Sequence, residues 1–346
     1  MLREKRLDWL DISRGIGIIF VVFAHTLIPQ IRANNRLAEF LWIFIYNFHM
    51  PLFFFISGFL FERNLSYYRN KYTIILSKTK YLMLPYVVFS VLAYLAIFTA
   101  MHIPPFAAVL NTGGYHITDF KSAVLQILFY NHHADQHLWF AYSLFLVFVV
   151  NILFPRLLKS KIFLVILIAL YISKAYIHYF GILNYTAGDL IFFSLARIMY
   201  SNQRKLKPSA LAGIAVLFVI TSGIYSFFYI TQMPQSVLKG IIYFIRIIAS
   251  VSGIVTVCFI SHILSESRLR SFFSRLGTYS YDIYLMHAPF LVSGLMGILT
   301  VYTPLHTAIC SLIILLIGLF VPYVLSRFVI RKTPLLSVPL LGKRYR

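Results

Sequence analysis

The sequence contains few charged residues. Only 12% of its 346 residues are Asp, Glu, Lys or Arg, and only ten are acidic. Soluble globular domains carry about twice this charged fraction. Hydrophobic residues make up 60% of the chain, and the mean hydropathy is +0.81. This composition excludes a soluble globular domain and predicts a polytopic membrane protein.

Cysteine is also scarce. The only two cysteines, Cys258 and Cys310, both lie inside apolar runs. Buried free cysteines behave as small hydrophobic residues, so neither a disulfide framework nor a cysteine metal site is expected. The N-terminus MLREKR precedes an apolar run but lacks the small-residue cleavage site of a signal peptide. We expect it to lead into a retained first membrane helix.

The scarcity of acidic residues leaves a net charge of +21. In a soluble protein such a charge points to nucleic acid. Here the basic residues fall mostly in short loops between apolar spans, where membrane topology and anionic lipids explain them better. We therefore expect membrane lipids, and no nucleic acid, among the partners of this chain.

Ten apolar stretches are candidates for membrane spans. They cover residues 12–31, 39–61, 81–101, 138–155, 162–180, 185–200, 209–230, 238–264, 276–298 and 304–327. With these spans, 23 Lys and Arg residues fall on one side and five on the other, which places both termini in the cytoplasm. The predicted fold is an all-α bundle of about ten transmembrane helices. Residues 1–346 would form one membrane domain without a separate soluble domain, because the longest segment outside the spans is short.

The first span carries polar groups that a purely structural anchor does not need. It reads LDWLDISRGIGIIFVVFAHT and includes Asp11, Arg14 and His25. Asp11 and Arg14 are three residues apart and share a helical face. Arg14 and His25 lie roughly 16 Å apart along the helix axis. Ionisable residues within membrane spans are functional candidates by default.

This Arg-to-His spacing resembles that of the acyltransferase-3 family of integral membrane O-acyltransferases. Three further segments are similar to motifs of that family: FHMPLFFFISGFLF at 48–61, HLWFAYSLF at 137–145 and LGTYSYDIYLMHAPF at 276–290. The resemblance covers nearly the whole chain. It implies a membrane acyltransferase that takes acetyl-CoA as donor substrate and has no tightly bound cofactor.

His25 is the leading catalytic candidate. As a neutral imidazole it can accept a proton from a sugar hydroxyl as a general base, and a covalent acetyl-imidazole is also chemically possible. The sequence does not choose between these two routes. A structural alternative is a hydrogen bond to a neighbouring helix.

Arg14 is the leading candidate for donor binding, because its planar donor fork suits phosphate. Its alternative role is a charge anchor at the membrane surface. Asp11 either orients the Arg14 guanidinium or lies exposed at the interface. Lys78 and Lys80 stand where many relatives carry two arginines, so we expect them either to bind the donor or to extend toward the interface.

Four residues are candidates for the acceptor side of a polar cavity: His49, Trp139, Tyr284 and His287. His49 precedes Pro51, which opens the helical backbone, so His49 either caps that break or lines the cavity. Tyr284 and His287 are three apart and share a helical face, although interhelical bonding would explain His287 equally well.

The remaining intramembrane charges need partners that the sequence does not reveal. Arg197 and Arg246 require partners such as Asp189 or a substrate anion. A further polar stretch, NHHADQHLW, holds His132, His133, Asp135 and His137. Nothing in it fixes a metal geometry, and no metal site is expected.

The sequence thus predicts an O-acetyltransferase of the bacterial inner membrane. It would transfer acetyl from cytoplasmic acetyl-CoA to a sugar hydroxyl of a surface or exported glycan. The alternative is a polytopic transporter or flippase of a glycan or lipid-linked intermediate, since a helix bundle with polar intramembrane residues would look the same. A non-catalytic accessory subunit is the third interpretation.

Overall fold

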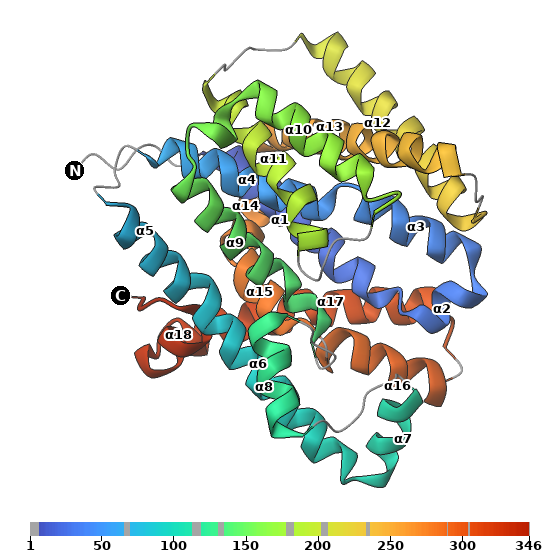
Figure 1. The fold of residues 1–346 in the computed structure, drawn as a ribbon. Coiled ribbons are helices and arrows are strands. Elements are labelled where there is room, and N and C mark those ends of the chain that lie inside the picture. The colour runs from blue at the N-terminus through green and yellow to red at the C-terminus, as the bar shows by residue number, and fades with distance from the viewer. Residues whose placement is uncertain are drawn as a thin grey trace. The chain divides into compact units, whose positions relative to one another are not determined.

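The structure is a computed structural model. It describes residues 7–65, 70–112, 119–130, 135–177, 183–201, 207–232, 236–288, 290–303 and 305–345. Regular secondary structure in these ranges is entirely helical (Figure 1). The predicted all-α class is therefore confirmed for the described part of the chain.

The chain forms two compact units. The first comprises Met1–Tyr67, Arg156–His178 and Ala187–Tyr281, and the second comprises Tyr68–Pro155, Tyr179–Thr186 and Asp282–Arg346. The expectation of a single membrane domain stays a prediction.

Among the described residues, nine α-helices belong wholly or mainly to the first unit. They are α1 (Asp8–Thr26), α2 (Pro29–Asn34), α3 (Arg36–Tyr46), α4 (His49–Arg63), α10 (Lys161–Ser173), α11 (Leu183–Ser201), α12 (Pro208–Ile230), α13 (Ser236–Ser265) and α14 (Arg270–Thr278). Helix α1 packs against α4, α13 and α14, and α12 packs against α13 and α3. Helix α1, which carries Asp11, Arg14 and His25, is therefore packed on several sides by other helices of the unit.

Polar and aromatic contacts hold α1 in place. The hydroxyl of Ser13 donates to that of Ser261 on α13 over 2.8 Å. Trp9 stacks on His262 with ring centroids 5.0 Å apart and meets Phe59 edge to face. These contacts join α1 to α13 and α4 near its first turns.

Two glycines let α1 and α14 approach at the level of the backbone. The Cα of Gly277 lies against the carbonyl of Asp11, and Gly15 lies against the carbonyl of Phe273. A side chain at either position would overlap the facing backbone atoms. The close packing of these two helices therefore depends on both glycines.

The 3₁₀-helix η4 (Leu157–Lys159) also belongs to the first unit, and the second unit contains the remaining helices of the described residues. They are α5 (Lys71–Lys78), the π-helix η2 (Thr79–Met83), α6 (Leu84–Met101), α7 (Pro104–Thr112), α8 (Phe120–Phe129), the 3₁₀-helix η3 (Gln136–Leu138), α9 (Trp139–Leu153), most of α15 (Ser280–Met286), η5 (Phe290–Gly294), α16 (Leu295–Tyr302), α17 (Thr307–Leu325), η6 (Ser326–Ile330) and α18 (Pro334–Leu341). Helices α5 and η2 pack against α9, and α18 packs against α6.

Seven helices within the described ranges are long and apolar enough to cross a membrane. They are Asp8–Thr26, Arg36–Arg63, Lys71–Met101, Gln136–Leu153, Pro208–Ile230, Leu238–Ser265 and Thr307–Ile330. The bent pair Ser280–Met286 and Leu291–Thr300 raises the number to eight if it is one span. The polytopic membrane architecture is supported, but the ten crossings and the cytoplasmic termini stay predictions.

Two of the expected spans correspond to helices that are not among the seven or eight candidates. The span expected at 162–180 corresponds to α10, an apolar helix of 13 residues that is shorter than a membrane crossing. The span expected at 185–200 corresponds to α11, which carries Asp189 and Arg197. Helix α10 is therefore too short to cross a membrane, and the charged residues of α11 lower its mean hydropathy.

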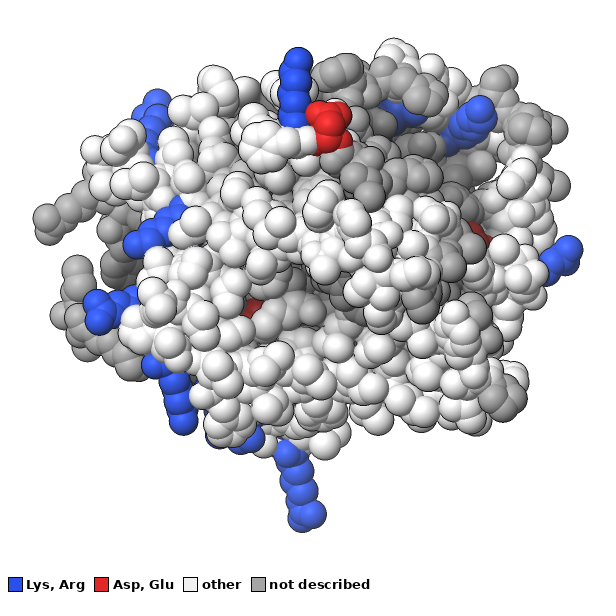
Figure 2. All heavy atoms as spheres, turned by 90° about the horizontal axis from the view of Figure 1, so that it is seen from below, with Lys and Arg blue, Asp and Glu red and all other residues white. Residues whose placement is uncertain are grey.

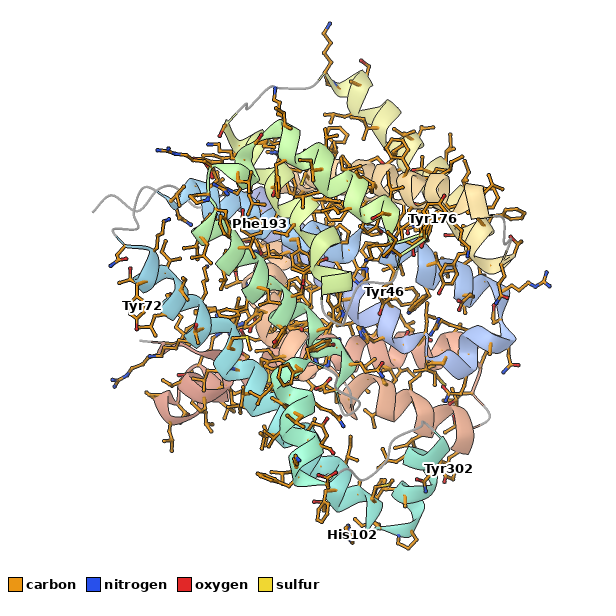
Figure 3. All side chains as sticks on the ribbon, viewed as in Figure 1. Tyr46, Tyr72, His102, Tyr176, Phe193 and Tyr302 are labelled. Carbon is orange, nitrogen blue, oxygen red and sulfur yellow. The ribbon has the colours of Figure 1, made fainter. Side chains whose placement is uncertain are left out.

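The outer surfaces of the helices are largely apolar. In the view of Figure 2 most of the surface belongs to uncharged residues, with Lys and Arg side chains scattered around it. Aromatic side chains such as Tyr72, Tyr176 and Tyr302 are more than half exposed (Figure 3). Such surfaces suit a lipid environment and its interfaces.

Candidate active site

Asp11 and Arg14 form an ion pair on α1. Nη1 of Arg14 lies 3.3 Å from Oδ1 of Asp11, and the Arg14 side chain is 30% exposed whereas that of Asp11 is 10% exposed. The carboxylate thereby orients the guanidinium, which keeps part of its surface accessible. The observed pairing favours the orienting role of Asp11 over full exposure at the interface.

His25 lies in the last turn of the same unbroken helix. Its Nδ1 is 2.8 Å from the carbonyl oxygen of Val21. Because a carbonyl oxygen can only accept a hydrogen bond, Nδ1 carries the proton, and Nε2 of the neutral ring is then the basic nitrogen. Since α1 is continuous, Arg14 and His25 lie roughly 16 Å apart along its axis.

His49 occupies the first position of α4 and is 1% exposed. Its Nδ1 donates to the carbonyl of Ile45 over 2.7 Å, and its ring meets that of Tyr46 edge to face at 4.6 Å. His25 and Arg246 both act electrostatically on this imidazole. His49 therefore fixes the start of α4 and also belongs to the electrostatic surroundings of His25.

Arg246 on α13 is embedded among aromatic side chains. Its guanidinium lies 5.4 Å from the ring centre of Tyr225 and hydrogen-bonds Tyr171, and Tyr243 also interacts with it. Tyr171 in turn interacts electrostatically with Asp189. The sequence identified Arg246 as a charge that needed partners, but the tyrosines that provide them carried no signal of their own.

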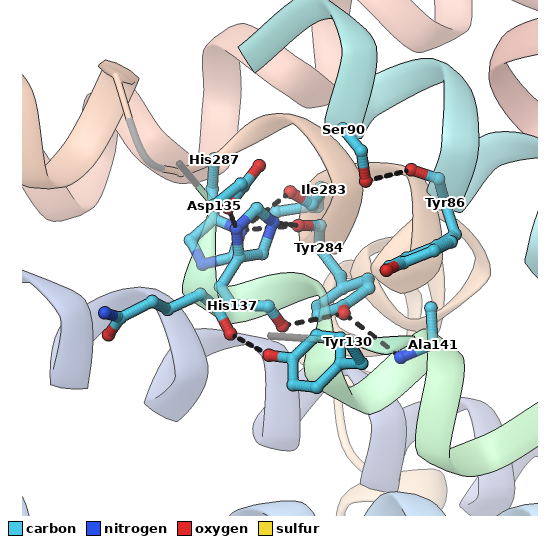
Figure 4. A network of polar contacts seen from close by, with 10 residues as sticks. Tyr86, Ser90, Tyr130, Asp135, His137, Ala141, Ile283, Tyr284 and His287 are labelled. Carbon is cyan, nitrogen blue, oxygen red and sulfur yellow. Dashed lines mark hydrogen bonds and ion pairs between the residues drawn. The ribbon is translucent and has the colours of Figure 1, made fainter. Parts of the chain in front are cut away.

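A polar network in the second unit joins η3 to α15 (Figure 4). The Tyr284 hydroxyl donates to the carbonyl of His137 over 2.8 Å, and Nε2 of His137 donates to the carbonyl of Tyr284 over 3.0 Å. His287 donates from Nδ1 to the same carbonyl over 2.8 Å. The predicted shared face of Tyr284 and His287 thus holds both beside His137.

Asp135 completes this network through a short contact with Nδ1 of His137. Burial raises the pKa of the Asp135 carboxyl, although His137 opposes that shift. Nε2 of His137 faces a carbonyl and so carries a proton, which leaves a single further proton to lie between Nδ1 and the carboxylate. His132 and His133, grouped with these residues in the sequence, lie outside the described ranges.

The other predicted residues of the second unit have separate surroundings. Lys78 places its ammonium 4.1 Å from the ring centre of Phe148, whereas Lys80 is exposed. Trp139 begins α9 and meets Phe140 edge to face at 6.3 Å. The donor role of Lys78 and Lys80 and the acceptor role of Trp139 stay predictions.

The partner of Arg197 is Glu62, a pairing the sequence did not reveal. Nε of this almost fully buried arginine lies 2.8 Å from Oε2 of Glu62, and Lys159 reaches the other oxygen of the carboxylate at 2.5 Å. Similarly, Asp282 accepts from Nε of Arg331 over 2.7 Å. These ion pairs join residues far apart in sequence and stabilise the helix packing.

A comparison with family models decides what kind of protein carries these features. A model described as "Acyltransferase domain", of the acyltransferase-3 type, matches residues 7–328, nearly the whole chain. The chain belongs to the acyltransferase-3 family. No curated protein and no solved structure matches it. The expectation of a membrane acyltransferase, drawn from the Arg14–His25 spacing and three motifs, is thereby confirmed.

The α1 residues of this acyltransferase can supply two elements of acyl transfer. The Nε2 nitrogen of His25 can accept the proton of an attacking hydroxyl. The Arg14 guanidinium, oriented by Asp11, can bind a phosphate. One rigid helix fixes the spacing of the base and the cation.

Proposed function

We propose that this acyltransferase transfers an acetyl group from cytoplasmic acetyl-CoA to a sugar hydroxyl of a surface or exported glycan, in a bacterial inner membrane. The observation that carries the proposal is the hydrogen bond from His25 Nδ1 to the Val21 carbonyl. It assigns the basic lone pair to Nε2, as a general base for an alcohol requires.

In the reaction, Nε2 of His25 removes the proton of the sugar hydroxyl as its oxygen attacks the thioester carbon. The tetrahedral intermediate then collapses, the carbon–sulfur bond breaks, and the departing CoA thiolate accepts that proton from Nε2. The products are the sugar acetate and free CoA. The histidine returns to its starting state, so no further reactant is needed.

Arg14 positions the donor in this proposal. A CoA headgroup held near Arg14 presents its thioester about 16 Å further along α1, near His25, because its pantetheine arm is extended. Arg14→Ala should therefore raise the apparent KM for acetyl-CoA. Lys78 and Lys80 are the second candidates for the donor phosphates, in the second unit.

The acceptor residues act on the sugar. His49 lies in the electrostatic surroundings of His25, and its substitution should change both acceptor use and the rate. Trp139 offers an aromatic face for a sugar ring, and Tyr284 and His287 offer polar groups. Substitutions at these three positions should alter acceptor use while leaving the apparent KM for acetyl-CoA unchanged.

Purified protein in sealed vesicles tests the proposal. Radiolabelled acetyl-CoA is supplied only on the side of the C-terminus, and glycan acceptor only on the opposite side. Label on the acceptor is the expected result, and it should vanish in His25→Ala. Glycan that crosses the membrane unmodified, with all label left on CoA, would replace the proposal with transport.

A single-turnover version separates direct transfer from a covalent intermediate. The enzyme is mixed with labelled acetyl-CoA without acceptor and then denatured. Direct transfer leaves the protein unlabelled. An acetyl-imidazole at His25 would leave label on the protein, which His25→Ala abolishes.

A further inference from the structure

A surface depression lies beside the first turn of α1. Its volume is about 590 Å³, within the range of small-molecule sites, and it belongs entirely to the first unit. Its lining residues are nearly all polar: Asp8, Ser267, Arg268, Arg270, Ser271, Ser274, Arg275, Thr278 and Tyr279. The proposed acyl-transfer step uses none of them.

The depression results from the amphipathic pattern of α14 and the turn before it. Hydroxyl residues recur at Ser267, Ser271, Ser274 and Thr278, three or four positions apart, so they form one stripe. Leu276, on the opposite face, and Gly277, on the flank of the stripe, are both buried. The hydroxyl stripe therefore faces outward while the apolar face packs.

Positive charge dominates this polar face. Arg268, Arg270 and Arg275 are all exposed, and Asp8 is the only acidic residue in the lining. Asp8 forms an ion pair with Arg270, which orients one guanidinium and neutralises one of the three positive charges. The lining keeps a net charge of +2 from these side chains. Arginine forks beside several hydroxyl groups are typical of phosphate recognition.

The depression is fixed to the helix that carries the proposed chemistry. Helix α14 packs closely against α1 through the backbone contacts of Gly277 with Asp11 and of Gly15 with Phe273. Asp8, in the lining, precedes Arg14 by six residues, or roughly 9 Å of helical rise. A ligand in the depression thus lies along α1 on the side of Arg14 away from His25.

We infer that this depression binds the adenosine 3′-phosphate end of the acyl donor, and that Arg268 and Arg275 hold this phosphate while Arg14 binds the pyrophosphate. The inference rests on the proposed function for the identity of the donor. Along α1, the adenosine then lies in the depression, the pyrophosphate at Arg14 and the thioester at His25. An anionic lipid headgroup shares the phosphate chemistry, so the experiment separates these two sources.

The test measures binding of adenosine 3′,5′-diphosphate to the purified full chain in neutral detergent by calorimetry. Arg268→Gln/Arg275→Gln removes two positive charges from the depression. Arg327→Gln/Lys332→Gln is the matched control, because it removes one positive charge from the start of η6 and one from the turn after it, both outside the lining. A parallel titration adds phosphatidylglycerol micelles as competitor.

The depression variant should bind adenosine 3′,5′-diphosphate at least about tenfold more weakly, the loss expected for removing hydrogen bonds to a charged group. The control should bind as the wild type does, and wild-type affinity should fall with added salt because the cations are exposed. The apparent KM of the depression variant for acetyl-CoA should rise in parallel with the loss of nucleotide affinity.

Three results would overturn the inference. They are wild-type affinity in the depression variant, equal weakening in the control, or displacement of the nucleotide by phosphatidylglycerol at equimolar amounts. The inference and the proposed function can fail separately. If the depression binds the nucleotide but the protein transfers no acyl group, only the proposed function is wrong. If the depression variant transfers acyl groups with an unchanged KM for acetyl-CoA, only the inference is wrong.

Discussion

The Nδ1 atom of His25 donates to the carbonyl oxygen of Val21, one helical turn earlier, over 2.8 Å. The same bond occurs at His102, whose Nδ1 lies 2.7 Å from the Phe98 carbonyl. His102 follows the last turn of α6 and is exposed. The two histidines share a local hydrogen bond and differ in surroundings, so they form a matched pair.

His25→Ala should reduce acyl transfer by about two to four orders of magnitude, because it removes the general acid–base group. Abundance in the membrane should stay near wild type, since the lost hydrogen bond lies within one helix. His102→Ala should retain full activity. Acyl transfer at the wild-type rate in His25→Ala would exclude this histidine from the mechanism.

Gly277→Ala should lower the thermal unfolding midpoint in detergent. The new methyl group would overlap the Asp11 backbone, and overpacking of this kind costs about 1–3 kcal/mol. Gly223→Ala is the control, because nothing lies within 4 Å of a Cβ at Gly223. Equal midpoints for the two variants would mean that α1 and α14 pack less closely than described.

Arg197→Gln and Lys159→Gln should differ greatly in their effect on stability, although both residues bind Glu62. Arg197 has a side chain only 1% exposed, whereas that of Lys159 is 39% exposed. Removing one partner of a buried pair costs about 3–5 kcal/mol, whereas an exposed pair contributes about 0–1 kcal/mol. Denaturant unfolding of both variants measures the difference, and similar losses would contradict the burial assigned to Arg197.

Single cysteines at Lys121 and Lys174, in a background without Cys258 and Cys310, test the topology together with a reporter after Arg346. Ten crossings place both cysteines outside and the C-terminus inside. Eight crossings without α10 and α11 keep Lys121 outside but move Lys174 inside. A membrane-impermeant thiol reagent distinguishes these outcomes, and a C-terminus on the same side as Lys121 would contradict both.

Local features of the site were predictable from sequence. Asp11 and Arg14 stand three apart, and the helix period brings them together without any help from the rest of the fold. The Nδ1 bond of His25 also lies within its own helix. The family followed from motifs that are each continuous in sequence. The long apolar helices followed from composition, whereas α10 was expected to be longer than it is.

The long-range partners were not predictable. The sequence suggested Asp189 as a partner for the buried arginines but gave no sign of the ion pair between Arg197 and Glu62, which lie 135 positions apart. Likewise, topology and anionic lipids were enough to explain the basic residues of the short loops, which include Arg268, Arg270 and Arg275. Their arrangement around a depression depends on α14 packing against α1.

The sequence by itself determined the apolar helices, the spacing of Arg14 and His25, and membership of the acyltransferase-3 family, because each depends on residues a few helical turns apart or on composition. Only the tertiary structure decided that Glu62 neutralises Arg197, that Tyr171 and Tyr225 surround Arg246, and that α14 closes on the start of α1. Those contacts join side chains on different helices, and their geometry is set by backbone approach at positions such as Gly277.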